Sequence, residues 1–137
     1  MTTISRIDVR IATASDAGAG TDGDVFVGVG GREFYIDSAQ NDFEAGADDT
    51  YTLGEAANVL NSSRNDPRNP QLDTTDLNKF PVYVRFEQPG DTSEWHLERA
   101  DVTVNPGGNQ IRYSALAGSP DIWLGRKSGR FCYLERV

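Results

Sequence analysis

The chain has 137 residues, an apolar share of 37% and a formal net charge of −8 at pH 7, which suits a single domain with a thin hydrophobic core. Gly, Asp, Asn and Thr are frequent and long runs of Ala, Leu, Glu and Lys are missing, which argues against a helical bundle. We expect a soluble protein without a transmembrane segment, because no apolar stretch reaches roughly 18 residues. The polar first ten residues contain no signal-peptide core, and the compartment stays open.

Short segments in which apolar and polar residues alternate follow one another and predict strands. The Gly30-Gly31 pair predicts a two-residue hairpin turn. A bulge is expected around Arg99 and Ala100, and a final hairpin over 127–129. The expected strands, which together indicate a β-sandwich or barrel, are 4–11, 25–29, 33–36, 50–53, 82–86, 95–97, 102–104, 110–113, 122–124 and 130–134.

Two polar regions interrupt this rhythm. A loop rich in Gly, Ala and Asp spans 15–24, before the second strand. A long polar excursion is expected at about 61–79, preceded by a helical turn around 54–60. Since no repeat of 20–50 residues occurs, we interpret 1–137 as one domain.

The acidic excess is local. The chain carries 13 acidic and 5 basic residues up to Thr75, and 8 of each from Asp76 onward. Nine acidic residues and one base lie between Asp16 and Asp49. Because an acidic surface without a basic stripe repels phosphates, we expect no nucleic-acid partner. A solvated face and a carboxylate cluster that binds a hard cation both explain this excess.

Two oxygen-rich segments, 18–27 and 41–51, are candidates for that cation site. Calcium takes six to eight oxygens from carboxylates, amides and backbone carbonyls. The glycines let the chain turn tightly enough to direct carbonyls inward, and clustered carboxylates repel one another when no cation is bound. The residues alone therefore nominate both Asp22 and Asp24.

The Gly-Thr-Asp turn at 20–22 before an apolar strand, followed by Asn-Asp-Phe-Glu at 41–44, resembles the PLAT/LH2 domain of polycystins, lipoxygenases and alpha-toxins. Trp95-His96-Leu97 is similar to the later Trp-x-Leu strand of that family. The resemblance is best at 4–51 and 82–104. It implies an all-β fold, a two-sheet antiparallel β-sandwich, whose end loops bind Ca²⁺ and direct the domain to lipid headgroups or a partner protein.

The resemblance also implies a set of calcium ligands. Backbone carbonyls fall on Gly18, Gly20 and Thr21, and carboxylates or amides fall on Asp22, Asn41, Asp42, Glu44 and Glu94, with Asp91 as a neighbour of the last. It favours Asp22 over Asp24. The alternative is that Asp22, Asn41 and Asp42 are Asx-turn or cap residues that order the loops, with Glu44 and Glu94 as ordinary surface carboxylates.

Two departures from the family matter. Some members carry Asp where this chain has Gly18, which predicts a weaker site. The loop tips at 15–17 and 89–93 lack a large apolar side chain, so we expect calcium to bridge to headgroups without deep insertion.

These patterns lead us to expect a monomeric, non-catalytic calcium-binding module. Gly-x-Ser-x-Gly, His-Glu-x-x-His and Cys/His metal motifs are absent from the sequence. Two alternatives stay open: a structural or protein-binding β-sandwich in which calcium only rigidifies loops, and a carbohydrate-binding or hydrolytic sandwich with paired carboxylates. We expect Trp95 and Trp123 in the core, Phe43 as a loop anchor and Cys132 as a buried, unreactive thiol.

Overall fold

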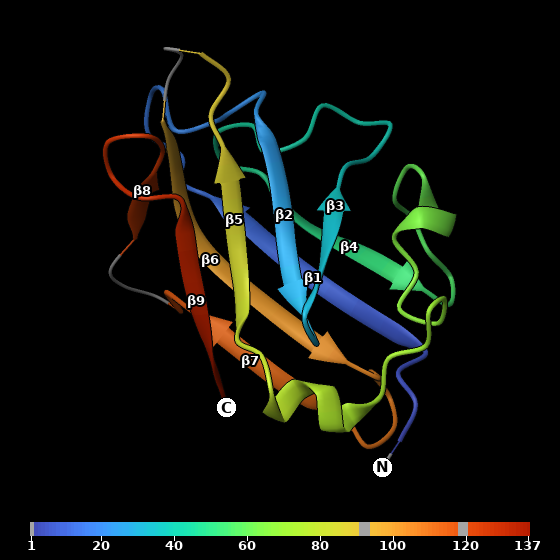
Figure 1. Ribbon diagram of the computed structural model, residues 1–137. Helices are drawn as coiled ribbons and strands as arrows, with labels where there is room; N and C mark the ends of the chain where they lie inside the picture. Colours follow the sequence, from blue (N-terminus) through green and yellow to red (C-terminus); the bar gives the residue numbers. More distant parts are fainter. Residues whose placement is uncertain (1, 91–93, 118–120) are drawn as a thin grey trace.

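The computed structural model describes residues 2–90, 94–117 and 121–137. This part of the chain forms strands in two packed layers, with two short 3-10 helices outside them (Figure 1). The all-β prediction is confirmed. The elements are β1 (Arg6–Thr13), β2 (Asp24–Val29), β3 (Arg32–Ile36), β4 (Asp48–Gly54), η1 (Ser62–Arg64), η2 (Thr74–Asn78), β5 (Val82–Glu87), β6 (Trp95–Val104), β7 (Ile111–Ala115), β8 (Ile122–Leu124) and β9 (Phe131–Arg136).

The two layers are antiparallel sheets that share one strand. One layer has the order β3-β2-β5-β9 and the other β7-β6-β1-β4, with β8 added to β6. β9 pairs with β5 through its first four residues and then with β7 at Glu135 and Arg136. The predicted two-sheet sandwich is confirmed, and β9 joins its sheets along one side.

The core follows from the period-two pattern, because alternate side chains of a strand point to the same face. Ile7, Val9 and Ile11 of β1 are buried with the inward residues of β2, β5 and β6 in one hydrophobic cluster. Trp95 is 0% exposed and Cys132 is buried, as predicted. Burying each large apolar side chain contributes roughly 1.5–3 kcal/mol, so this cluster is the main source of stability.

The open side of the sandwich is covered by the segment between β4 and β5. The side-chain oxygen of Asn65 accepts a hydrogen bond from Tyr35 N–H on the edge of β3 (2.7 Å), and that of Asn58 accepts one from Thr52 N–H on the edge of β4 (2.7 Å). The helical turn predicted around 54–60 does not form. Gly54 and Ala56 have φ values of 87° and 59°, which a right-handed helix excludes.

Three local predictions need correction. Ala12 pairs with Arg99 and Thr13 with Leu97, so the extra residue of the bulge is Glu98, just before the predicted position. The strands of the predicted final hairpin lie in different layers, on β6 and β5, and only a Gly125–Gly129 bridge joins them. Trp123 is 39% exposed, because β8 places its ring outside, against His96.

The described residues include no helix that is long and apolar enough to cross a membrane.

Candidate functional site

The loop before β2 and the loop after β3 meet at one end of the sandwich (Figure 1). Thr21 N–H donates to the Phe43 carbonyl (3.0 Å), and Gly46 N–H donates to the Ala14 carbonyl (3.0 Å). Gly20 allows this approach, since a Cβ there would lie 2.9 Å from Ala45 N. The segments 14–23 and 37–47, which we call the first and second loops, therefore form one rigid surface.

Phe43 anchors the second loop, as predicted. Its ring is 4% exposed, stacks on Tyr51 at 5.5 Å between centroids and meets Trp95 edge-on at 5.5 Å. The residue has a φ of 59°, an unfavourable backbone conformation for a bulky side chain. Aromatic packing of this kind stabilises the conformation that presents the flanking residues of the loop to solvent.

Two adjoining pockets lie between the loops. The first, of about 330 Å³, is lined by Gly18, Gly20, Thr21, Asp22, Glu44, Ala45 and Pro89. The second, of about 230 Å³, is lined by Thr21, Asp22, Gly23, Asp24, Tyr35, Ile36, Asp37, Gln40, Asn41, Asp42 and Phe43. Thr21 and Asp22 belong to both. Seven of the eight predicted ligands thus surround this pair of pockets, with Asp22 between them.

Most of these ligand candidates keep unengaged oxygens. Within the described part of the chain, the carbonyls of Gly18, Gly20 and Thr21 accept no backbone hydrogen bond. The side chains of Asp22, Asn41 and Glu44 are exposed. Of this set, the Thr21 hydroxyl alone is engaged, since it accepts a hydrogen bond from Gly23 N–H (2.9 Å). Free carbonyls beside free carboxylates are the mixture of donors that calcium takes.

Asp42 differs from the other candidates, because its carboxylate orders the second loop. It accepts hydrogen bonds from Ser38 N–H (2.8 Å), the Ser38 hydroxyl (2.6 Å) and the Tyr51 hydroxyl (3.0 Å). Burial and then this bond to Asp42 raise the pKa of Tyr51. These contacts are those of the Asx-turn alternative, although a carboxylate oxygen has lone pairs for a cation as well.

The second pocket is lined by two carboxylates that the predicted ligand set does not include, Asp24 and Asp37. Asp24 lines it and accepts a hydrogen bond from the Tyr35 hydroxyl (2.7 Å), which raises the pKa of Tyr35 to about 12. Asp37 lines it too, and burial followed by the neighbouring Asp42 carboxyl group raises the pKa of Asp37. The position of Asp37, directly after a predicted strand that ends at the same side as Asp22, is a signal that could have identified it.

Glu94 is the predicted ligand that lies outside the described lining of the two pockets. Its carboxylate packs against the backbone of Gly125. Its Oε2 atom is buried without a hydrogen-bond partner, a costly state for a carboxylate that a cation would relieve. The neighbouring candidate Asp91 lies outside the described residues.

Side chains alone do not build a complete metal site at this end of the sandwich. In the described ranges, no three His, Cys, Asp or Glu side chains gather closely enough to hold an ion by themselves. A cation between the loops would need the carbonyls of Gly18, Gly20 or Thr21 in addition to Asp22 and Glu44. Such an all-oxygen, carbonyl-rich set fits Ca²⁺ and does not fit zinc or copper.

Known proteins share this architecture. No family model and no curated protein matches the chain, but solved structures do. Alpha-toxin from Clostridium absonum has a TM-score of 0.66 at 23% identity, and covers 98% of this chain and 32% of its own. Clostridium perfringens alpha-toxin has a TM-score of 0.65 at 19% identity, and the match covers 97% of this chain and 32% of the toxin. Coral 8R-lipoxygenase has a TM-score of 0.62 at 17% identity, and the match covers 96% of this chain and 17% of the lipoxygenase.

The fold is that of a PLAT/LH2 domain. The resemblance predicted from the loop motifs is confirmed at the level of the fold, which is all that such identities show. The chain spans about a third of the alpha-toxins and about a sixth of the lipoxygenase. The similarity thus covers one PLAT/LH2 domain and leaves the catalytic parts of those proteins unmatched.

Proposed function

We propose that the chain is a non-catalytic PLAT/LH2 module that binds Ca²⁺ between its two loops and docks onto lipid headgroups or a partner protein. One observation carries the proposal. The first pocket is lined by five residues that keep unengaged oxygens, Gly18, Gly20, Thr21, Asp22 and Glu44, and its two loops are tied together by the Thr21–Phe43 hydrogen bond. The carboxylates among the lining residues give both pockets a negative charge.

Calcium would supply positive charge to this end of the molecule. Asp22 and Glu44, with the carbonyls of Gly18, Gly20 and Thr21, would hold it, and Asp42 would hold the second loop in place. Waters are among the ligands that complete the six to eight positions around a bound Ca²⁺. The remaining positions are then open to an anionic group of a lipid or of a partner.

The comparisons with known proteins also support a calcium-dependent binding role. The coral 8R-lipoxygenase that shares the fold is described as calcium-activated through a C2-like domain. The match to that protein and to the alpha-toxins covers the PLAT/LH2 portion alone, which supports a binding role without catalysis for this chain.

A second candidate function is favoured by Asp42. Because Ser38 and Tyr51 already satisfy its carboxylate, the loops hold their shape through hydrogen bonds. The chain would then be a structural or protein-binding sandwich in which calcium only stiffens the loops further. Such a module would bind its partner in the absence of calcium.

Vesicle co-sedimentation separates these functions. We expect vesicles of phosphatidylcholine with phosphatidylserine to pellet the protein with Ca²⁺ and to release it when EGTA is added. Asp22→Asn should remove this dependence, whereas Glu135→Gln, which changes an exposed carboxylate near the C-terminal end of β9, should not. Pelleting that is equal with Ca²⁺ and with EGTA would favour the second function.

A further inference from the structure

The turn between β8 and β9 is the most basic segment of an acidic protein. Residues 125–130 contain Arg126, Lys127 and Arg130 and no acidic residue, in a chain of net charge −8. All three side chains are exposed. Within the described ranges, Lys127 and Arg130 form no ion pair. Because salt screens charges beyond about 8 Å, these local positive charges decide what approaches this turn.

The turn is held in one conformation. Gly125 and Gly129 exchange two backbone hydrogen bonds (2.8 and 3.1 Å), and Gly129 has a φ of 105° that suits glycine. Arg126 N–H donates to the side-chain oxygen of Gln88 (2.9 Å). A fixed turn presents its charged side chains with little further loss of backbone freedom on binding.

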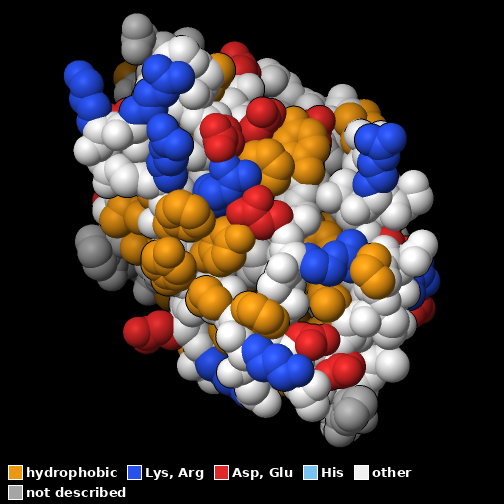
Figure 2. Space-filling model, viewed as in Figure 1, with side chains coloured by type: hydrophobic (Ala, Val, Ile, Leu, Met, Phe, Trp, Pro, Cys, Tyr) orange, Lys and Arg blue, Asp and Glu red, His pale blue; other side chains and the backbone are white. Residues whose placement is uncertain are grey.

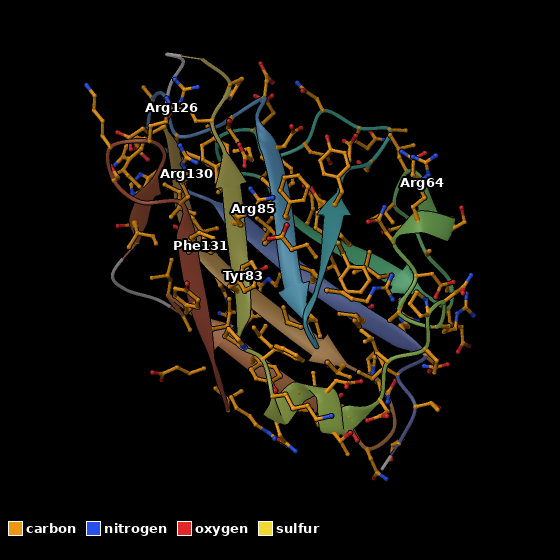
Figure 3. All side chains as sticks on the ribbon, in the orientation of Figure 1. Arg64, Tyr83, Arg85, Arg126, Arg130 and Phe131 are labelled. Carbon is orange, nitrogen blue, oxygen red and sulfur yellow. The ribbon has the colours of Figure 1, made fainter. Side chains whose placement is uncertain are left out.

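This turn also lies beside the candidate calcium site. Gln88, which holds Arg126, is followed by Pro89, and Pro89 lines the first pocket together with Asp22 and Glu44. Figure 3 shows Arg126 toward the end of the sandwich where the loops meet, Arg130 just below it, and Arg64 at the opposite edge of the view. A surface that contacts the first pocket would therefore contact the turn as well.

One exposed aromatic ring adjoins the basic residues. Phe131 follows Arg130 and is 43% exposed, on the outer face of β5 and β9, whereas Trp123 stacks on His96 on the outer face of the other layer. Phe131 continues into an outer-face cluster with Tyr83 and Tyr133, at centroid distances of 5.3 and 5.8 Å. Figure 2 shows this hydrophobic patch with basic side chains beyond one end of it. Basic residues beside exposed aromatic residues suit the headgroup region of a membrane.

We propose that the β8–β9 turn is a second docking element for an anionic phospholipid surface, in which Arg126, Lys127 and Arg130 bind headgroup phosphates and Phe131 enters the interface. The inference rests on the proposed docking function. It also accounts for loop tips that carry no apolar side chain at 15–17, because the anchor lies on the neighbouring turn. Calcium would remove the repulsion of the acidic loops and let the turn make contact.

The test replaces all three basic residues with glutamine: Arg126→Gln, Lys127→Gln and Arg130→Gln. Each basic residue near an anionic surface strengthens partition roughly fivefold, so the triple variant should bind phosphatidylserine-containing vesicles about a hundredfold more weakly with Ca²⁺ present. Binding of the wild type should weaken with added salt. Phosphatidylcholine vesicles without anionic lipid are the negative control.

A matched control carries the same change of charge elsewhere. Arg64→Gln, Lys79→Gln and Arg136→Gln alter exposed basic residues outside the turn and should reduce binding only slightly. Equal losses in the two triple variants would overturn the proposal, and so would unchanged binding of the turn variant. If the turn variant binds normally while calcium still raises the melting temperature, the turn is refuted and the calcium site stands.

Discussion

Asp22 and Asp42 illustrate how two acidic residues of one site differ in their contacts. Asp22 is exposed and has no partner among the described residues, whereas Asp42 receives hydrogen bonds from Ser38 and Tyr51. The loop motifs identify both residues. The motifs do not reveal the hydrogen bonds that Asp42 accepts. Tyr51 lies nine residues further on, and its approach to Asp42 depends on the pairing of β4 with β1.

This difference predicts opposite effects of two alanine substitutions. Asp22→Ala should leave the calcium-free protein as stable as the wild type and should abolish stabilisation by calcium. Asp42→Ala should cost roughly 1–3 kcal/mol without calcium, since it leaves the hydroxyl groups of Ser38 and Tyr51 without their acceptor. Urea denaturation in EGTA measures both; equal stabilities of the two variants would refute this division of roles.

The two sheets, at the scale of elements, have outer faces of different chemistry. The outer face of β1 and β4 carries ion pairs such as Arg10–Asp48 (2.7 Å). On β2, β5 and β9 the aromatic residues form a patch in which Arg85 lies over Phe26 (4.2 Å) and pairs with Glu33 (2.8 Å). A solvated sheet face is normally polar, so the aromatic face is the one suited to contact with another surface.

The Glu33–Arg85 pair predicts a pH dependence. The hydrogen bond from Arg85 holds the pKa of Glu33 below its usual value of 4.5, so the pair stabilises the fold above that value and loses this effect as the pH falls through the lowered pKa. Glu33→Gln should cost at most about 1 kcal/mol at pH 7, because the pair is partly exposed. The difference from wild type should vanish near pH 3; a gap that persists there would exclude the ionic contribution.

The segment 55–79 protects the edge of β3, and losing this protection should destabilise the protein more than losing the Glu33–Arg85 pair. Asn65 is 6% exposed and satisfies the Tyr35 N–H of β3. Asn65→Ala should therefore destabilise the protein by roughly 1–3 kcal/mol and promote aggregation through the freed edge. Denaturation and light scattering measure the two effects. Asn69→Ala changes an exposed residue of the same segment and serves as the control. It should neither destabilise the protein nor promote aggregation.

Local sequence patterns predict where the strands lie better than they predict which strands pair with one another. The Gly30-Gly31 turn forms with φ values of 61° and 83°, as a primed hairpin turn requires, because two residues suffice to determine it. The placement of β8 on β6 and β9 on β5 depends on contacts distant in sequence, and alternation cannot indicate it. The same holds for Trp123, whose exposure depends on the layer to which β8 belongs.

At the scale of the whole molecule, charge of both signs gathers at one end. The acidic loops of the 16–49 segment and the basic turn at 125–130 are linked through Gln88 and Pro89. The sequence predicts the fold, because its motifs resemble those of PLAT/LH2 domains. It does not place the basic turn beside the acidic loops, since more than 75 residues separate them along the chain.

Calcium binding at the two loops is the central claim, and a thermal melt tests it most directly. With Ca²⁺ at 100–1,000 times its dissociation constant, the wild type should gain about 3–4 kcal/mol of stability, whereas Asp22→Asn should gain none and Mg²⁺ should be less effective. A melting temperature of the wild type that does not change with added calcium would contradict the account.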